Sequence, residues 1–276
     1  MTEAPAPDPL ELLDVARQAA AAGAAVLAKR SEAGLHVENK GASGDWVTAY
    51  DTEAEYAVRD VINRMRPFDA VTGEELEASV PEDPSGIRWS VDPLDGTTNF
   101  IRNIPFYATS VAAVNADGEW LAGVVHAPAL VRVYWAAKGH GAWLAEHGSL
   151  RRLHGPDPDR TGKLLGTGFS YEPEVRTEQY AALADLMDGY ADVRRLGSAA
   201  LDLCMVADGT LDAYVERGLN EHDFAAGALI AEEAGLTVRR PGSPDRKIGR
   251  RRAAGSRDHG LAGAARLGRP RHAVCA

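Results

Sequence analysis

The order of the hydrophobic patterns along the chain is the feature that most limits its fold. Apolar residues recur at helical spacing over residues 10–31, where Asp8 is available as a cap, and over 52–65, where Pro67 ends the pattern. Six short runs rich in β-forming residues follow, divided by turn residues, at 69–73, 87–92, 107–114, 120–126, 131–136 and 141–145. This order predicts two helices and a sheet.

The second half of the chain alternates between the two periodicities. After a polar connection at 154–163, we expect strands at 164–168, 192–195 and 211–215, and helices at 177–189, 198–208 and 224–235. The pattern has no fixed-period repeat and no long linker. We therefore expect a mixed α+β and α/β fold made of two packed subregions, residues 1–150 and 151–276, with a border near 150–160.

Composition excludes several classes of protein. The chain has 276 residues, of which 45% are hydrophobic, which is enough to bury a core without disulfides or structural metal. Its two cysteines, Cys204 and Cys275, are far apart and form no disulfide framework, and Cys204 is expected to be a buried core residue. The apolar run at 19–28 is too short to cross a bilayer, and the N-terminus does not resemble a secretory signal. These features predict a cytoplasmic protein that spans no membrane.

The charge is unevenly distributed. The segment from Arg239 to the C-terminus carries eleven basic and two acidic residues, so the net charge of −10 leaves −19 on residues 1–238. An acidic body argues against a nucleic-acid binder as a whole. It suits a protein that gathers divalent cations, although a solubilising surface explains most of these acids equally well.

The segment DPLDGTT at residues 92–98 carries the strongest chemical signal. Proline biases Asp92 toward extended geometry, so we expect the strand to end there, the chain to turn immediately afterwards and Gly96 to allow a tight bend. The carboxylates of Asp92 and Asp95, with a carbonyl such as that of Leu94, then offer the oxygen ligands that Mg²⁺ prefers. Taken alone, the same residues also describe a capped turn.

The surroundings of this segment favour the metal site. Thr97 and Thr98 resemble the opening of a helix, where unpaired N–H groups favour phosphate. Further acids stand at the ends of other expected elements and would come together where those elements converge: Asp51, Glu74, Glu75 and Asp223. Metal and phosphate would therefore meet at one place.

Four motifs, in this order, resemble those of the inositol monophosphatase family of metal-dependent sugar phosphatases. They are VTAYD (47–51), GEE (73–75), WSVDPLDGTTNF (89–100), and RRLGSAALDLCMVADGTLDAYVERG (194–218) followed by D-x-A-A-G-x-x-I-x-x-E-A-G from Asp223. The resemblance covers most of residues 10–240. It implies a layered αβαβα sandwich.

The resemblance also implies roles for individual residues. The Mg²⁺ ligands would be Glu74, Asp92, the Leu94 carbonyl, Asp95 and Asp223. The catalytic residues would be Asp51, Thr97 and Glu75. Thr97 and Asp51 would orient a metal-bound water, and Glu75 would support the metal ligands without binding the metal itself. The substrate would contact Lys40 near the phosphate entrance, amides near Gly96 and Thr97, and a polyol side formed by Asp95, Gly197, Ser198, Ala199 and Glu216.

The implied activity is Mg²⁺-dependent hydrolysis of inositol monophosphate or a similar polyol phosphate by in-line attack of a metal-activated water. Two or three Mg²⁺ ions, inhibition by Li⁺ and a homodimer come with the resemblance. Histidinol-phosphate, fructose-1,6-bisphosphate and 3'-phosphoadenosine 5'-phosphate phosphatases of the same superfamily are alternatives. Ser198 and Glu216 match the inositol-type pattern best.

Two departures from the family pattern stand out. His222 replaces the usual Trp before Asp223 and is expected to pack or to contact a ligand rather than bind Mg²⁺, which prefers oxygen. The C-terminal segment has three arginines at 250–252 in place of an apolar strand, and we expect a solvated or frayed tail. A catalytically idle scaffold that binds RNA or transcription proteins through this basic tail, from about residue 239, is the alternative that is not an enzyme.

Overall fold

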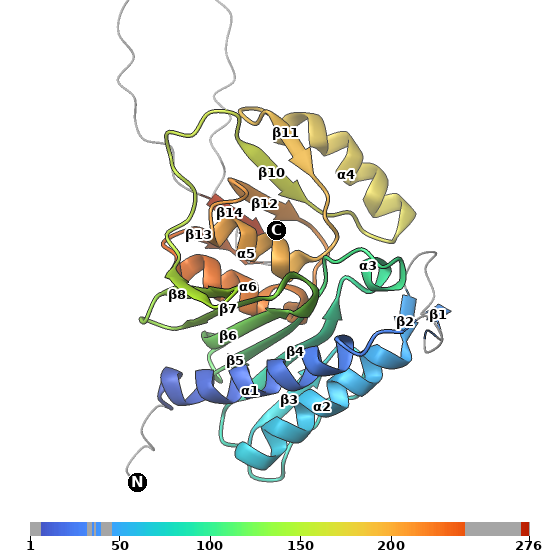
Figure 1. The fold of residues 1–276 in the computed structure, drawn as a ribbon, viewed down its shortest axis with the longest axis vertical. Helices are drawn as coiled ribbons and strands as arrows, with labels where there is room; N and C mark the ends of the chain where they lie inside the picture. The colour runs from blue at the N-terminus through green and yellow to red at the C-terminus, as the bar shows by residue number, and fades with distance from the viewer. Residues whose placement is uncertain (1–6, 32–34, 36, 40–45, 241–271, 276) are drawn as a thin grey trace, which may run out of the picture.

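The computed structural model describes residues 7–31, 35, 37–39, 46–240 and 272–275. Its elements form successive layers of helix, sheet, helix, sheet and helix (Figure 1). The expected αβαβα sandwich is confirmed. Lys40 and the three arginines at 250–252 lie outside the described residues.

A seven-stranded sheet forms the first β layer, in the strand order β3-β4-β5-β6-β7-β8-β9. Within this sheet, as the structure describes it, β3 and β4 pair in parallel and the other neighbours pair antiparallel. The strands are β3 (Ala70–Gly73), β4 (Arg88–Asp95), β5 (Ala108–Val114), β6 (Trp120–Ala127), β7 (Arg132–Ala137), β8 (Ala142–Glu146) and β9 (Ser149–Arg152). All but β9 were expected. The central strand β5 is buried at every residue because both of its faces are covered, which explains its unbroken apolar sequence.

Two helices, α1 (Pro9–Leu27) and α2 (Ala49–Met65), cover one face of this sheet (Figure 1). The Asp8 carboxylate accepts a hydrogen bond from Leu10 N at 2.9 Å, so the predicted cap is confirmed. The second helix begins three residues earlier than its periodicity predicts, because Thr48 and Asp51 form a capping box. Their apolar faces share a core with the sheet that includes Leu12, Ile62 and Trp89.

The opposite face of the sheet packs against α5 (Ala199–Ala207) and α6 (Glu221–Glu233). These two helices also pack against the second sheet, which has the order β11-β10-β12-β14-β13 and is parallel throughout. A helix buried between two sheets is apolar on all sides, as the run from Phe224 to Ala231 is. Gly123 of β6 allows the close approach of α6, since a Cβ there would lie 2.9 Å from the Ala226 Cα.

The strands of the second sheet are β10 (Leu164–Thr167), β11 (Asp192–Arg194), β12 (Ala213–Glu216), β13 (Thr237–Arg239) and β14 (His272–Cys275). The helix α4 (Pro173–Leu186) lies beyond β10 and β11 (Figure 1). The expectation of a frayed tail is wrong for its last described residues, because β14 pairs with both β12 and β13 inside the sheet. Backbone pairing with two neighbours holds this strand despite the basic segment before it.

Three further differences affect the site. The expected turn directly after Asp92 is wrong, because β4 continues to Asp95 with only a register irregularity between these two residues, and the chain turns at Gly96. The helix expected from residue 224 begins at Glu221, which places Asp223 in its first turn. The helix expected to open at Thr97 and Thr98 is confirmed as the short α3 (Thr97–Ile101). Short elements that were not predicted are β1 (Val37–Asn39), β2 (Trp46–Thr48) and the 3₁₀ turn η2 (Pro128–Leu130).

The first sheet ends with β9 at Arg152 and the second begins with β10 at Leu164. The expected border at 150–160 overlaps the end of β9 and the connection to β10, and the division into two subregions stays a prediction. Within the described residues, no helix combines the length and apolarity that a bilayer crossing requires.

Candidate active site

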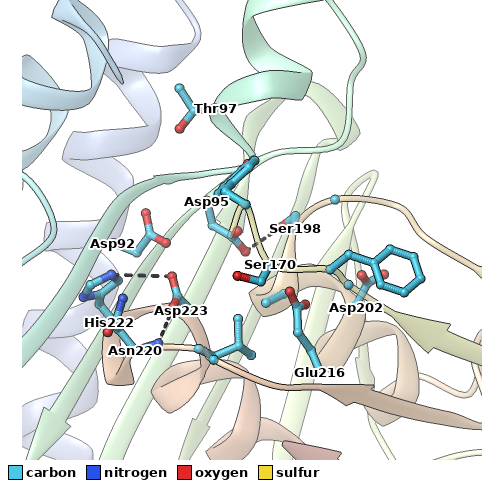
Figure 2. A pocket seen from close by; sticks show the side chains of 18 of the residues that line it. Asp92, Asp95, Thr97, Ser170, Ser198, Asp202, Glu216, Asn220, His222 and Asp223 are labelled. Atoms are coloured by element: carbon cyan, nitrogen blue, oxygen red, sulfur yellow. Dashed lines mark hydrogen bonds and ion pairs between the residues drawn. The ribbon is translucent and has the colours of Figure 1, made fainter. Parts of the chain in front are cut away.

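A cavity of about 390 Å³ opens where elements of both sheets end (Figure 2). Its walls come from the C-terminal ends of β4, β10 and β12 and from the first turns of α5 and α6. Ligands of open α/β sheets bind at such ends, because loops and helix starts converge there. Both halves of the chain therefore contribute to one site.

The end of β4 places two carboxylates in this cavity. Asp92 Oδ1 accepts a hydrogen bond from Leu94 N at 3.0 Å, which fixes the carboxylate beside its own turn. Gly96 follows with φ of 99°, and a Cβ there would lie 2.9 Å from the Phe106 carbonyl oxygen. Both the positive φ and the close approach require glycine at this position.

Thr97 connects this turn to α2. Its hydroxyl lies 3.1 Å from Asp51 Oδ1 and 3.1 Å from the Leu94 carbonyl oxygen. The other Asp51 oxygen accepts hydrogen bonds from Thr48 N at 2.8 Å and Thr48 Oγ1 at 2.6 Å. Asp51 is fully buried behind Thr97 and does not line the cavity itself. The capping box of α2 thus holds a carboxylate that can orient or accept the Thr97 proton.

A buried ion pair on α2 supports the loop that carries Glu74. Glu55 contacts Arg59 at 2.6 Å, and its second oxygen accepts a hydrogen bond from Glu75 N at 2.8 Å. Arg59 donates to the carbonyl oxygens of Leu76 and Glu77 at 3.0 and 2.9 Å. The pair therefore fixes the backbone on the C-terminal side of Glu74.

The first turn of α5 contacts Asp95 directly. Ser198 caps this helix and donates its hydroxyl to Asp95 Oδ2 at 2.6 Å, and Ala200 N donates to the same oxygen at 2.7 Å. Asn99 of α3 donates to the carbonyl oxygens of Phe106 and Leu196, both at 2.8 Å. These bonds join the turn after β4 to the loop before α5.

Asp223 is fixed by the start of α6. Its Oδ2 accepts a hydrogen bond from Asn220 N at 2.6 Å within a capping box. His222 Nε2 lies 3.5 Å from Asp223 Oδ1 (Figure 2). Contact with an expected metal ligand is one of the two roles foreseen for His222, and that it does not bind Mg²⁺ stays a prediction.

Glu216 forms the far wall of the cavity, at the end of β12. The Tyr214 hydroxyl donates to its carboxylate. A Cβ at position 168 would lie 1.8 Å from Glu216 Oε2, so Gly168 leaves the space that this carboxylate fills.

Burial and mutual repulsion dominate the electrostatics of the cavity. Burial raises the pKa of Asp95 to about 8, against hydrogen bonds from Ser198 and Ala200 that lower it. The pKa of Asp92 is raised well above its usual range by burial, and the charges of Glu74, Asp95 and Asp223 raise it further. Four carboxylates that repel one another in a desolvated cavity are stabilised by a cation.

The donor set fits Mg²⁺ in its chemistry. The four carboxylates and the Leu94 carbonyl supply only oxygen atoms, which this ion prefers. In the part of the chain that the structure describes, no three His, Cys, Asp or Glu side chains are already arranged so that they could hold a metal ion. We expect side chains to rotate when a metal ion binds, since Asp95 and Asp223 each commit an oxygen to hydrogen bonds.

Stability of the metal-free protein should depend on pH through Asp95. Its folded pKa of about 8 exceeds the ordinary value of 3.8, so the folded state binds the proton more tightly than the unfolded state. That contribution is fully present below about pH 4 and is lost as the pH rises through 8. In EDTA, melting temperatures should therefore show Asp95→Asn gaining stability relative to the unaltered protein between pH 5 and 8. A constant difference across this range would contradict the raised pKa.

The structure brings most of the predicted residues to this cavity. Those that line it are Glu74, Asp92, Leu94, Asp95, Gly96, Thr97, Gly197, Ser198, Ala199, Glu216 and Asp223. Asp51 lies behind Thr97, and Glu75 contributes a backbone contact to Glu55 rather than part of the cavity wall. The roles assigned to these residues stay predictions.

Sequence reasoning missed several residues of the site. Glu55 follows Asp51 by one helical turn on α2, a spacing that could have indicated a shared face. Asp202 is one turn after Ser198 and interrupts an otherwise apolar helix, which was a readable signal. Arg195, which belongs to the motif at 194–218 but was given no role, and the aromatic Phe169, which no local pattern indicated, also line the cavity.

Comparisons with known proteins agree with this architecture. The sequence matches the model of the Inositol monophosphatase family over residues 8–268. An inositol-1-monophosphatase of Mycobacterium leprae is 43% identical over 250 residues, covering 85% of each chain. A Nus factor SuhB of Pasteurella multocida is 37% identical, covering 82% of this chain and 84% of the relative.

A solved structure of Mycobacterium tuberculosis SuhB superimposes with a TM-score of 0.71 at 41% identity, covering 84% of this chain and 87% of that one. Both the sequence and the fold are therefore shared over most of the length. The chain belongs to the inositol monophosphatase family and has the fold of the phosphatases in that family.

Proposed function

We propose that this protein is a Mg²⁺-dependent phosphomonoesterase that hydrolyses inositol monophosphate or a similar polyol phosphate. The observation that carries the proposal is the convergence of Glu74, Asp92, Asp95 and Asp223 on one cavity from three separate segments, the loop after β3, the end of β4 and the start of α6. Desolvated carboxylates at this density are costly without a cation.

Glu74, Asp92, Asp95, Asp223 and the Leu94 carbonyl would hold the ions. Mg²⁺ supplies charge neutralisation for the ester, a lower pKa for the attacking water and compensation of charge on the leaving oxygen. Such compensation is required because phosphate monoesters are anionic and hydrolyse extremely slowly without catalysis.

The protein's own groups position the nucleophile. Thr97 Oγ1 faces the cavity and lies 3.1 Å from Asp51 Oδ1. Burial raises the pKa of Asp51, which makes its carboxylate a better proton acceptor than an exposed aspartate. Thr97 can therefore accept a hydrogen bond from the attacking water and pass its own proton toward Asp51.

The opposite side of the cavity suits an alcohol rather than a second anion. The carboxylate of Glu216 accepts a hydrogen bond from the Tyr214 hydroxyl, and burial raises its pKa. This wall therefore presents a hydrogen-bond acceptor next to a hydroxyl group. Ser198 and Gly197 complete this wall. A polyol can donate hydrogen bonds to these acceptors, whereas an ionised second phosphate has no hydrogen to donate to them.

Phosphate release from a panel of esters tests the proposal. With Mg²⁺ present, inositol 1-phosphate should be hydrolysed at least tenfold faster, in kcat/KM, than histidinol phosphate, fructose 1,6-bisphosphate or 3'-phosphoadenosine 5'-phosphate, because its leaving alcohol carries the most hydroxyl donors. Release should cease in EDTA. Absence of Mg²⁺-dependent release from every ester would contradict the proposal. A higher kcat/KM for another ester than for inositol 1-phosphate would assign the protein to that substrate class instead.

One finding favours a second candidate, a role in transcription. The Pasteurella multocida relative, 37% identical to this chain, is named a Nus factor. Such a role does not require desolvated carboxylates around a cavity, so we rank it behind the phosphatase. It would be supported if RNA or transcription proteins bound equally well to the unaltered chain and to a variant without turnover. Inhibition by Li⁺, a homodimer and a cytoplasmic location stay predictions from the family resemblance.

A further inference from the structure

Asp202 is a buried acid that the proposed chemistry does not use. It lies on α5, one turn after the Ser198 cap, and it lines the cavity although it is only 1% exposed. Within the described part of the chain, its Oδ1 has no hydrogen-bond partner. Figure 2 shows it on the same side of the cavity as Glu216, away from Asp92 and Asp223.

Keeping this carboxyl group is costly to the fold. A buried polar atom without a hydrogen bond destabilises a protein, because its lost contacts with water are not replaced. Burial raises the pKa of Asp202 well above its usual range, the charges of Asp95 and Glu216 raise it further, and only Arg195 opposes them. The other buried residues of α5 are apolar, so an apolar side chain would suit the helix. The oxygen atom therefore has a use other than stability.

We infer that Asp202 is a specificity-determining residue whose free Oδ1 accepts a hydrogen bond from a hydroxyl of the leaving alcohol, one remote from the ester. The inference rests on the proposed phosphatase function. Asp202 lies beside Glu216 and Ser198, on the side of the cavity that we assign to the leaving alcohol. An ionised phosphate group has no hydrogen to donate to this acceptor oxygen, and an alkyl group would leave the oxygen unpaired.

The consequence is discrimination between alcohols of the same shape. A site with a buried acceptor favours the substrate that supplies a donor and rejects the analogue that lacks it. Inositol 1-phosphate and cyclohexyl phosphate share a six-membered ring and differ in their free hydroxyls. Their ratio of kcat/KM values isolates the hydroxyl contacts from the chemistry of phosphate release.

Asp202→Leu should lower kcat/KM for inositol 1-phosphate about tenfold, and leave kcat/KM for cyclohexyl phosphate within about twofold. Its melting temperature should rise, because the unpaired polar atom is gone. Asp202→Asn keeps an acceptor oxygen and should retain most of the preference for inositol. A merely structural role would lower turnover of both esters together with the melting temperature.

Asp212→Asn is a matched control. Asp212 also has a buried Oδ1 without a partner in the described residues, but it does not line the cavity, and its Oδ2 accepts a hydrogen bond from Leu164 N at 2.8 Å. Neutralising this acid should leave the ratio between the two esters unchanged. An equal change of the ratio in Asp212→Asn and Asp202→Leu would overturn the inference.

Binding of myo-inositol itself separates this inference from the proposed function. Saturation-transfer NMR, with and without Mg²⁺, should give weaker inositol binding to Asp202→Leu than to the unaltered protein. If no ester is hydrolysed but this difference appears, the phosphatase proposal fails, and Asp202 keeps only a contact with a bound polyol, not a role in choosing the leaving alcohol. If esters are hydrolysed and either the ester ratio or inositol binding is the same in both proteins, the role of Asp202 is overturned and the phosphatase proposal stands.

Discussion

Asp95→Asn should lower Mg²⁺-dependent phosphate release at least about a hundredfold in kcat/KM while the protein stays folded. The substitution removes a charge that faces the cavity together with Asp92 and Asp223. An asparagine carbonyl can still accept the hydrogen bonds from Ser198 and Ala200, so the packing is kept. Because burial raises the pKa of Asp95 to about 8, the neutral side chain suits the metal-free fold. Turnover and melting temperature, measured on the same samples, check the expected loss of activity and the expected retention of the fold.

Asp117→Asn makes the same chemical change on an exposed turn between β5 and β6. It lies outside the cavity and should keep normal turnover. Near-normal turnover in Asp95→Asn, or an equal loss in both variants, would show that the Asp95 charge is not needed.

Gly73→Ala should give the largest loss of stability. A Cβ at this position would lie 2.0 Å from Glu55 Oε1, and Glu55 is fully buried, so it has no open space to move into. Displacing it breaks the contact with Arg59 and the hydrogen bond from Glu75 N. Disrupting a buried ion pair costs about 3 kcal/mol, which lowers the melting temperature by about 6 °C or more. Turnover should fall at least tenfold, because the same loop carries Glu74.

A double-mutant cycle identifies the cause. In a Glu55→Ala background the added methyl group has room, so Gly73→Ala should cost at least about 1 kcal/mol less there than in the unaltered protein. Denaturant unfolding of the four proteins measures this difference. If the losses in free energy of unfolding from the two substitutions were strictly additive, the space left by Gly73 would not be needed for Glu55.

Local patterns in the sequence predicted the elements whose burial follows a period. The helices α1 and α2 and the strands β3 to β8 were predicted within a few residues, because one buried face gives a clear repeat. The boundaries failed where side-chain caps decide them. Thr48 and Asn220 start α2 and α6 three residues earlier than the apolar pattern indicates.

The site was predictable where acids stand at the ends of elements, as Asp92, Asp95 and Asp223 do. It was not predictable where the contact is distant in sequence. Asn99 donates to Leu196, which is 97 residues away, and no local pattern indicates such a bond. The strand β14 was missed for the same reason. Its four residues are too few to predict a strand, and backbone pairing with β12 and β13 stabilises it in the sheet.

The account depends most on a divalent cation held by the cavity carboxylates. Anomalous X-ray scattering from crystals grown with Mn²⁺ in place of Mg²⁺ locates bound cations directly. We expect Mn²⁺ peaks in contact with the carboxylates of Asp92, Asp95 and Asp223 in the unaltered protein, and loss of at least one peak in Asp95→Asn. Mn²⁺ bound only elsewhere on the chain, or unchanged peaks in the variant, would contradict the account.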